Sequence, residues 1–180
     1  RQLITHTAGF VYEIWDANAQ QAVTAGLTES FLAGGNFLVN PLAFQPGTQW
    51  EYGTNTDWLG ILIEQRSGDR LVDYFDKNIF EPLGMKDTHF ELPEDKLDRS
   101  VTMMARTEDQ LTVSSFGQPT AKDRHSLPFY SGGGGLYSTV ENYGRVLQML
   151  LSAGTANGSQ VLAAKTCLLY TSDAADDQAC

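Results

Sequence analysis

The stretch Phe44-Gln-Pro-Gly-Thr-Gln-Trp-Glu-Tyr52, which continues as Gly53-Thr-Asn-Thr-Asp-Trp-Leu-Gly60, decides how this chain is interpreted. Its Pro46-Gly47 dipeptide is typical of a turn. Trp50 and Tyr52 then alternate with polar residues, which indicates a short extended segment. We therefore expect the tyrosine to follow a tight turn closely.

A helix is predicted directly after this tyrosine. Thr54 and Asp57 have the spacing of a capping box, in which the two side chains satisfy free backbone amides at a helix start. Gly68 is a stop signal, so the helix is expected over residues 54–67. Tyr52 would then lie on a short linker between a turn and a helix N-terminus. From such a position a phenol can point into a cleft rather than into a core.

Further helices are predicted from the period of apolar residues. The strongest patterns cover residues 70–79 and 138–153, and weaker patterns cover 16–25 and 28–33. Two extended segments, 101–107 and 111–116, are able to pair as a short β-hairpin. The chain is therefore expected to be mostly α-helical.

The helix that begins near residue 138 has the clearest amphipathic pattern. Ser138 and Glu141 have capping-box spacing, and Gly154 ends the pattern. The apolar stripe expected to face a core consists of Val140, Tyr143, Val146, Leu147, Leu150 and Leu151.

Five segments in a fixed order, spread from Arg1 to about Lys165, carry a family resemblance. They are Leu3-Ile-Thr-His-Thr-Ala-Gly9, Pro46-Gly-Thr-Gln-Trp-Glu-Tyr52, Phe80-Glu-Pro-Leu-Gly-Met85, Ser131-Gly-Gly-Gly-Gly-Leu-Tyr-Ser-Thr139 and Gln148-Met-Leu-Leu151. Together they resemble the serine β-lactamase-related hydrolases, a family that includes penicillin-binding proteins. The resemblance implies that the chain is the helical region of an α+β fold of the β-lactamase and transpeptidase type.

The residues that follow the tyrosine differ between the enzyme classes of this family. Class C β-lactamases and D-alanyl peptidases usually have Asn two residues after it, whereas this chain has Thr54 there and Asn55 one residue later. The short distance from Tyr52 to Gly60 looks more like the family VIII esterases. The resemblance therefore implies a carboxylic-ester hydrolase, with a β-lactamase or D-amino-acid peptidase as the alternative.

The resemblance also implies a mechanism, of which this chain holds one part. Family members form an acyl-enzyme on the serine of a Ser-x-x-Lys motif, and the lysine ammonium favours the phenolate of the motif tyrosine, here Tyr52. None of the chain's lysines has serine three residues before it. We therefore expect an internal fragment of an enzyme, truncated at both ends and inactive alone, with Tyr52 as its catalytic residue.

The C-terminal segment differs from the rest of the chain. Residues 167–180 look like a translated sequencing adaptor, so we expect a partial hydrolase domain over 1–166 and a non-native, unstructured tail over 167–180. Both cysteines, Cys167 and Cys180, lie in this tail. They therefore indicate neither a disulfide nor a compartment, and cytoplasmic, periplasmic and secreted locations all stay open.

Composition restricts the partners. The net charge is −10, and no Lys/Arg cluster is present, which argues against nucleic acid and anionic membranes. No apolar run is long enough to span a bilayer. The histidines His6, His89 and His125 lack metal-ligand spacing and are interpreted as surface or structural residues. We therefore expect no cofactor or metal, while the resemblance implies a small-molecule ester or amide substrate. The sequence leaves the oligomeric state open.

Several residues allow a structural and a functional interpretation. Asp57 is able to cap its helix or point at the cleft, and capping is favoured. The glycines of 132–135 are expected to bring backbone beside the cleft, and Trp15 is able to line an acyl pocket. A second function class, a non-catalytic binding protein with this fold, also stays open.

Overall fold

A computed structural model describes residues 1–107, 109–115 and 117–171 of the chain. The chain forms two compact units. The first contains residues 1–71 together with 130–135, and the second contains 72–129 and the residues from Leu136 onward. Each unit therefore combines segments that are distant in sequence.

The first unit is built from irregular chain around two helices, α1 (Ala17–Thr24) and α2 (Asn55–Ser67), with a 3₁₀ turn, Phe37–Val39, between them. Asp16 caps α1 by accepting a hydrogen bond from the Ala19 amide. The prediction of α2 is confirmed, including its stop at Gly68, which has the left-handed conformation. The helix predicted over 28–33 is wrong, because this segment forms turns.

The helix predicted over 70–79 extends further than expected. It runs as α3 (Leu71–Phe75), a π-helical turn (Asp76–Phe80) and α4 (Glu81–Leu83), and Gly84 ends it with a positive φ of 67°. A 3₁₀ helix, Glu94–Arg99, follows. Proline at the start of α4 is compatible with the helix because the π-helical turn changes the backbone bonding there.

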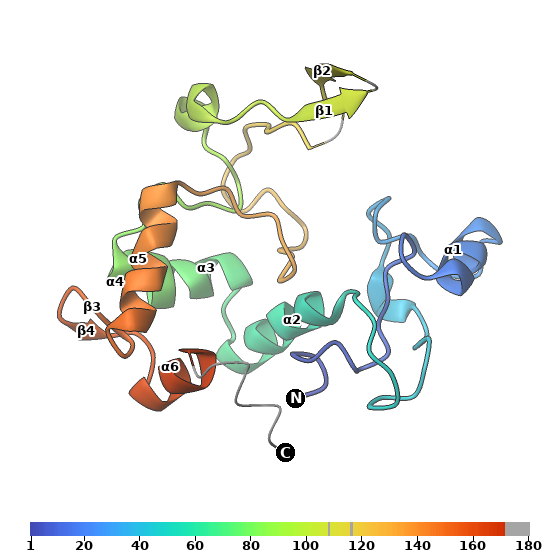
Figure 1. The fold of residues 1–180 in the computed structure, drawn as a ribbon, viewed down its shortest axis with the longest axis horizontal. Helices are drawn as coiled ribbons and strands as arrows, with labels where there is room; N and C mark the ends of the chain where they lie inside the picture. The colour runs from blue at the N-terminus through green and yellow to red at the C-terminus, as the bar shows by residue number, and fades with distance from the viewer. Residues whose placement is uncertain (108, 116, 172–180) are drawn as a thin grey trace. The chain divides into compact units, whose positions relative to one another are not determined.

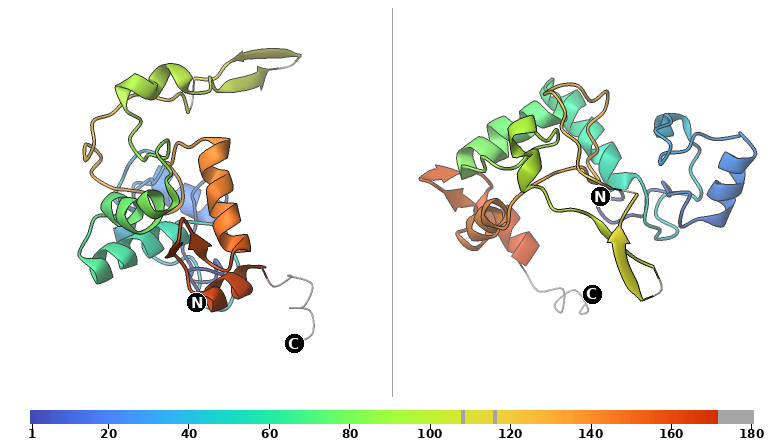
Figure 2. Two further views of the ribbon diagram at one scale, coloured as in Figure 1. Left: turned by 90° about the vertical axis from the view of Figure 1, so that its left-hand side faces the viewer. Right: turned by 90° about the horizontal axis from the view of Figure 1, so that it is seen from above.

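Helix α5 (Val140–Leu151) packs beside α4 in the second unit (Figures 1 and 2). Its cap is Thr139, whose hydroxyl accepts a hydrogen bond from the Asn142 amide, so the predicted cap at Ser138 is wrong by one residue. Glu141 instead pairs with Arg145 one turn later.

The core of this unit lies between α5 and the helix that precedes Gly84. Its buried members are Phe80, Leu83, Met85 and Met149, and Val146 and Leu150 pack against them. The predicted stripe on α5 is therefore correct only in part. Its other members are exposed, namely Val140, Tyr143, Leu147 and Leu151.

The strands are few and short. The predicted hairpin is confirmed as β1 (Met104–Thr107) paired with β2 (Gln110–Val113), and it extends away from the helices of its unit (Figure 2). A second pair joins β3 (Thr155–Ala156) to β4 (Ser159–Gln160). No helix in the described part of the chain is long and apolar enough to cross a membrane.

The expected unstructured tail begins with structure. Helix α6 spans Ala164–Thr171, and Cys167 is buried. The expectation is therefore wrong for residues 167–171, because they continue a helix that begins at Ala164 and buries Cys167. Residues 172–180 lie outside the described part of the chain, and the non-native origin of the tail stays a prediction.

Leu83 is 1 % exposed, so we expect that a cavity at this position would strongly destabilise the second unit. Leu83→Ala should lower the free energy of unfolding by about 2–5 kcal/mol, because its neighbours can collapse only partly into the space. Urea denaturation measures this. Leu151→Ala is the control, since Leu151 is 84 % exposed and should change stability by less than about 0.5 kcal/mol. Equal losses in both variants would contradict this core.

Candidate active site

Tyr52 lies in the first unit, where the sequence places it, between the Pro46-Gly47 turn and α2. Its side chain is 44 % exposed. The ring packs against two others, with centroid distances of 4.9 Å to His6 and 5.5 Å to Tyr12. The phenol is thus held by aromatic contacts from a distant segment while part of it faces solvent.

Backbone contacts on both sides of Tyr52 hold this segment against residues 6–12. The Glu51 amide donates to the His6 carbonyl, and the Gly47 amide donates to the Thr7 carbonyl. At Gly53 a Cβ would lie 2.3 Å from the Phe10 carbonyl oxygen, so only glycine permits this approach. These contacts place residues 6–12 alongside the motif.

Asp57 is the centre of a buried network. Its side chain is fully buried, and Oδ2 accepts a hydrogen bond from the Tyr12 hydroxyl at 3.1 Å. Oδ1 accepts from the Ser131 hydroxyl at 2.5 Å and from the Gly133 amide at 3.2 Å. The favoured interpretation of Asp57 as a helix cap is therefore wrong, as is the predicted capping box, because Thr54 makes no side-chain cap bond either.

Because Ser131 and Gly133 bind Asp57, the glycine-rich loop 132–135 lies close to the start of α2. At Gly132 a Cβ would lie 2.2 Å from the Thr56 carbonyl oxygen, and at Gly133 one would lie 3.0 Å from the Asp57 carboxylate. Side chains at these two positions would push the loop away from the helix. The requirement for glycine here is therefore close backbone packing in the unit that holds Tyr52.

Asn55 is also fully buried, and its contacts indicate which ring nitrogen of His6 carries the proton. The Asn55 amide nitrogen donates to the Phe10 carbonyl at 3.0 Å and lies 3.2 Å from Nδ1 of His6. Reversing the amide would place two carbonyl oxygens against each other, so Nδ1 must accept and the imidazole proton resides on Nε2. His6 is thus a structural residue, as predicted, but one in contact with Tyr52.

The other predicted residues do not join this site. Trp15 is 66 % exposed and His125 contacts Asp73 in the second unit. His89 belongs to the second unit as well, and burial lowers its pKa. Among the described residues no group of three His, Cys, Asp or Glu side chains has the arrangement of a metal site.

Sequence reasoning missed Tyr12 and Ser131, which supply two of the three donors to Asp57. Neither belongs to a local motif that identifies a partner of Asp57. The available signal was Asp57 itself, since the side chain of an aspartate in the first turn of a helix is able to bind groups other than its own backbone.

The network predicts a specific stability loss. Asp57→Ala should lower the free energy of unfolding by about 1–3 kcal/mol, because it leaves the Tyr12 and Ser131 hydroxyls without their acceptor. Asp98→Ala, at an exposed position, is the matched control and should stay within about 0.5 kcal/mol. Urea denaturation distinguishes the two, and equal effects would argue against the network.

The shifted pKa of Tyr12 leads us to expect that the free energy of unfolding depends on pH above about pH 10. Burial and then the negative charge of Asp57 raise the pKa of the Tyr12 phenol above its ordinary value of about 10. The unfolded state therefore ionises first, so the stability from this group is complete below pH 10 and is lost as pH rises further. Between pH 9 and 11 the free energy of unfolding should fall less steeply in Tyr12→Phe than in wild type. Tyr143→Phe, at an exposed tyrosine, should retain the wild-type slope.

Comparison with known proteins shows the family of this chain. The model of the Beta-lactamase family matches residues 1–179. An ML-236A carboxylate methylbutanoyltransferase from Penicillium citrinum is 34 % identical over 157 residues, which cover 84 % of this chain and 36 % of the relative. Lovastatin esterase from Penicillium rubens is 29 % identical over 167 residues, covering 84 % of this chain and 39 % of the relative.

A solved structure agrees with these sequence matches. Simvastatin synthase from Aspergillus terreus matches 93 % of this chain and 41 % of its own with a TM-score of 0.75 and 29 % identity. The chain thus spans less than half the length of the relatives that it matches. With a family model that matches nearly its whole length, the chain belongs to the Beta-lactamase family.

Proposed function

We propose that this chain is the part of a serine acyl-enzyme hydrolase that carries the tyrosine of proton transfer, and that carboxylic esters are its substrates. The observation that carries the proposal is the setting of Tyr52. Its phenol is partly exposed, while its ring is fixed between His6 and Tyr12 at the start of α2. The names of related proteins, a lovastatin esterase and a methylbutanoyltransferase, agree with acyl chemistry on esters.

In the proposed reaction a serine hydroxyl attacks the ester carbonyl and its proton passes to the Tyr52 oxygen. The ester C–O bond then breaks, and the alcohol leaves with that proton. Water hydrolyses the acyl-serine and releases the carboxylic acid. Because this chain has no Ser-x-x-Lys, the nucleophile and the lysine would come from residues outside it.

Ester chemistry is preferred to β-lactam chemistry because of Asn55. The alternative enzymes usually have asparagine two residues after the tyrosine, where this chain has Thr54, and the next residue, Asn55, is fully buried against His6 and Phe10. Acyl transfer to an alcohol instead of water is a second candidate, and the methylbutanoyltransferase relatives favour it. Both reactions use the same acyl-enzyme.

The test is Tyr52→Phe in a longer protein that contains this chain and a Ser-x-x-Lys motif. The turnover number for 4-nitrophenyl butanoate should fall by at least ~100-fold, the usual scale for a general acid or base, while KM changes much less. Tyr143→Phe, at an exposed tyrosine on α5, is the matched control and should keep the wild-type rate. Near wild-type turnover in Tyr52→Phe would exclude the proposed proton transfer.

The 180-residue chain alone should show no ester or β-lactam hydrolysis above background, because it has no Ser-x-x-Lys serine to accept the acyl group. Mass spectrometry after treatment with a fluorophosphonate probe tests this. A stable adduct on one serine would reveal a different nucleophile. If the longer protein also forms no adduct and hydrolyses no ester, the non-catalytic binding protein becomes the better interpretation.

A further inference from the structure

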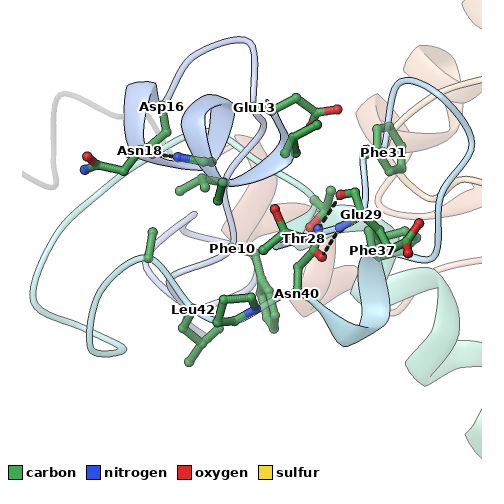
Figure 3. Close-up of a pocket in the computed structure, with 17 residues that line it drawn as sticks. Phe10, Glu13, Asp16, Asn18, Thr28, Glu29, Phe31, Phe37, Asn40 and Leu42 are labelled. Atoms are coloured by element: carbon green, nitrogen blue, oxygen red, sulfur yellow. Dashed lines mark hydrogen bonds between the residues drawn. The ribbon is translucent and has the colours of Figure 1, made fainter. Parts of the chain in front are cut away.

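The first unit contains a cavity of about 200 Å³ beside α1 (Figure 3). At about 30 Å³ per water, this is the space of roughly seven waters. Its apolar wall includes three phenylalanines, Phe10, Phe31 and Phe37, together with Val23 and Leu42. A cavity of this kind is suited to a small apolar group rather than to a large ligand.

The cavity wall also carries carboxylates but no cation. Glu13, Asp16 and Glu29 line it, and residues 2–65 contain neither lysine nor arginine. Glu13 accepts hydrogen bonds from the Ser30 hydroxyl at 2.7 Å and the Leu32 amide at 3.0 Å, and Asp16 accepts one from the Ala19 amide. These partners are neutral, so they leave the negative charges of the wall in place.

The Glu13 carboxylate is charged at neutral pH. Burial alone would raise the pKa of Glu13, but the hydrogen bonds from Ser30 and Leu32 outweigh it and lower the pKa. Burial and then the negative charge of Asp16 raise the pKa of Glu51, the residue before Tyr52. One carboxylate of the cavity wall, Asp16, therefore acts on the residue that precedes Tyr52.

The cavity is also joined to Tyr52 through the chain and through aromatic contacts. Thr54, two residues after Tyr52, lines the cavity, so their Cα atoms are at most about 7.6 Å apart. Phe31 of the cavity wall contacts Tyr12 with 5.1 Å between ring centroids, and Tyr12 in turn contacts Tyr52. A group in the cavity can therefore belong to a substrate whose ester reaches Tyr52.

We propose that this cavity receives an uncharged apolar group of the ester substrate, and that its carboxylates select against substrates carrying a carboxylate on that group. The inference rests on the proposed function and names the substrate class. An anionic group entering the cavity would lose water to aromatic walls, where no lysine or arginine of residues 2–65 replaces that hydration. It would also meet the negative charges of Glu13 and Asp16.

Binding tests the inference on the 180-residue chain without any turnover. In ligand-observed NMR, methyl pentanoate should bind at least ~10-fold more tightly than pentanoate. Ala22→Phe, which fills the cavity from α1, should abolish methyl pentanoate binding, and Gln21→Phe on the same helix is the matched control because Gln21 does not line the cavity. Equal binding of the two ligands to the wild-type chain would overturn the inference, as would binding of methyl pentanoate that survives Ala22→Phe.

Turnover tests the same inference in the longer protein. The 4-nitrophenyl ester of monomethyl glutarate should have a kcat/KM at least ~10-fold above that of the hydrogen glutarate ester at low salt, and 0.5 M NaCl should reduce this ratio. Asp16→Asn keeps a good helix cap and removes one charge, so the ratio should fall by ~3-fold or more. Asp98→Asn in the second unit should keep the ratio.

The outcomes separate the two proposals. No hydrolysis of either ester would contradict the proposed function, and the binding experiment would still decide the charge selection. Hydrolysis of both esters at similar rates, or a ratio that Asp16→Asn does not lower, would contradict the charge selection and leave the proposed function standing.

Discussion

The buried carboxylate of Asp57 is the constraint on which the first unit depends. A carboxylate without solvent is unfavourable unless donors replace the lost water, and here the Tyr12 hydroxyl, the Ser131 hydroxyl and the Gly133 amide do so. Its place in the first turn of α2 adds the favourable end of the helix dipole. Since the donors come from segments 45 to 76 residues away, the charge is satisfied only when all three segments meet.

This meeting of segments also positions the candidate catalytic tyrosine. The Tyr12 hydroxyl donates a hydrogen bond to Asp57, and the Tyr12 ring packs against the ring of Tyr52. One residue therefore contacts both the buried carboxylate and the partly exposed phenol. On the other side His6, held by Asn55, packs against the same phenol ring. Rigid support of this kind is what proton transfer requires, because the donor and acceptor must stay within hydrogen-bond reach.

The acidic side chains described in the two units bind different kinds of partner. In the second unit Asp87 is paired with Lys96 and Arg99, and Asp73 is paired with Arg124. In the first unit Glu13, Asp16 and Asp57 bind hydroxyls and backbone amides, which leave the negative charge in place. This difference is the basis of the charge selection that we propose for the cavity.

The sequence by itself indicated the family through the resemblance of five segments. It also determined the α2 helix with its stop at Gly68, the β1–β2 hairpin and the place of Tyr52, because these follow from local spacing and turn chemistry. It could not determine the role of Asp57, the exposed face of α5 or the helical state of Cys167. Capping and apolar stripes are local preferences, and a partner from a distant segment overrides them when it satisfies a buried charge or covers one side of a helix. Only the tertiary structure brought Tyr12 and Ser131 to Asp57, because long-range contacts leave no periodic signal in the chain.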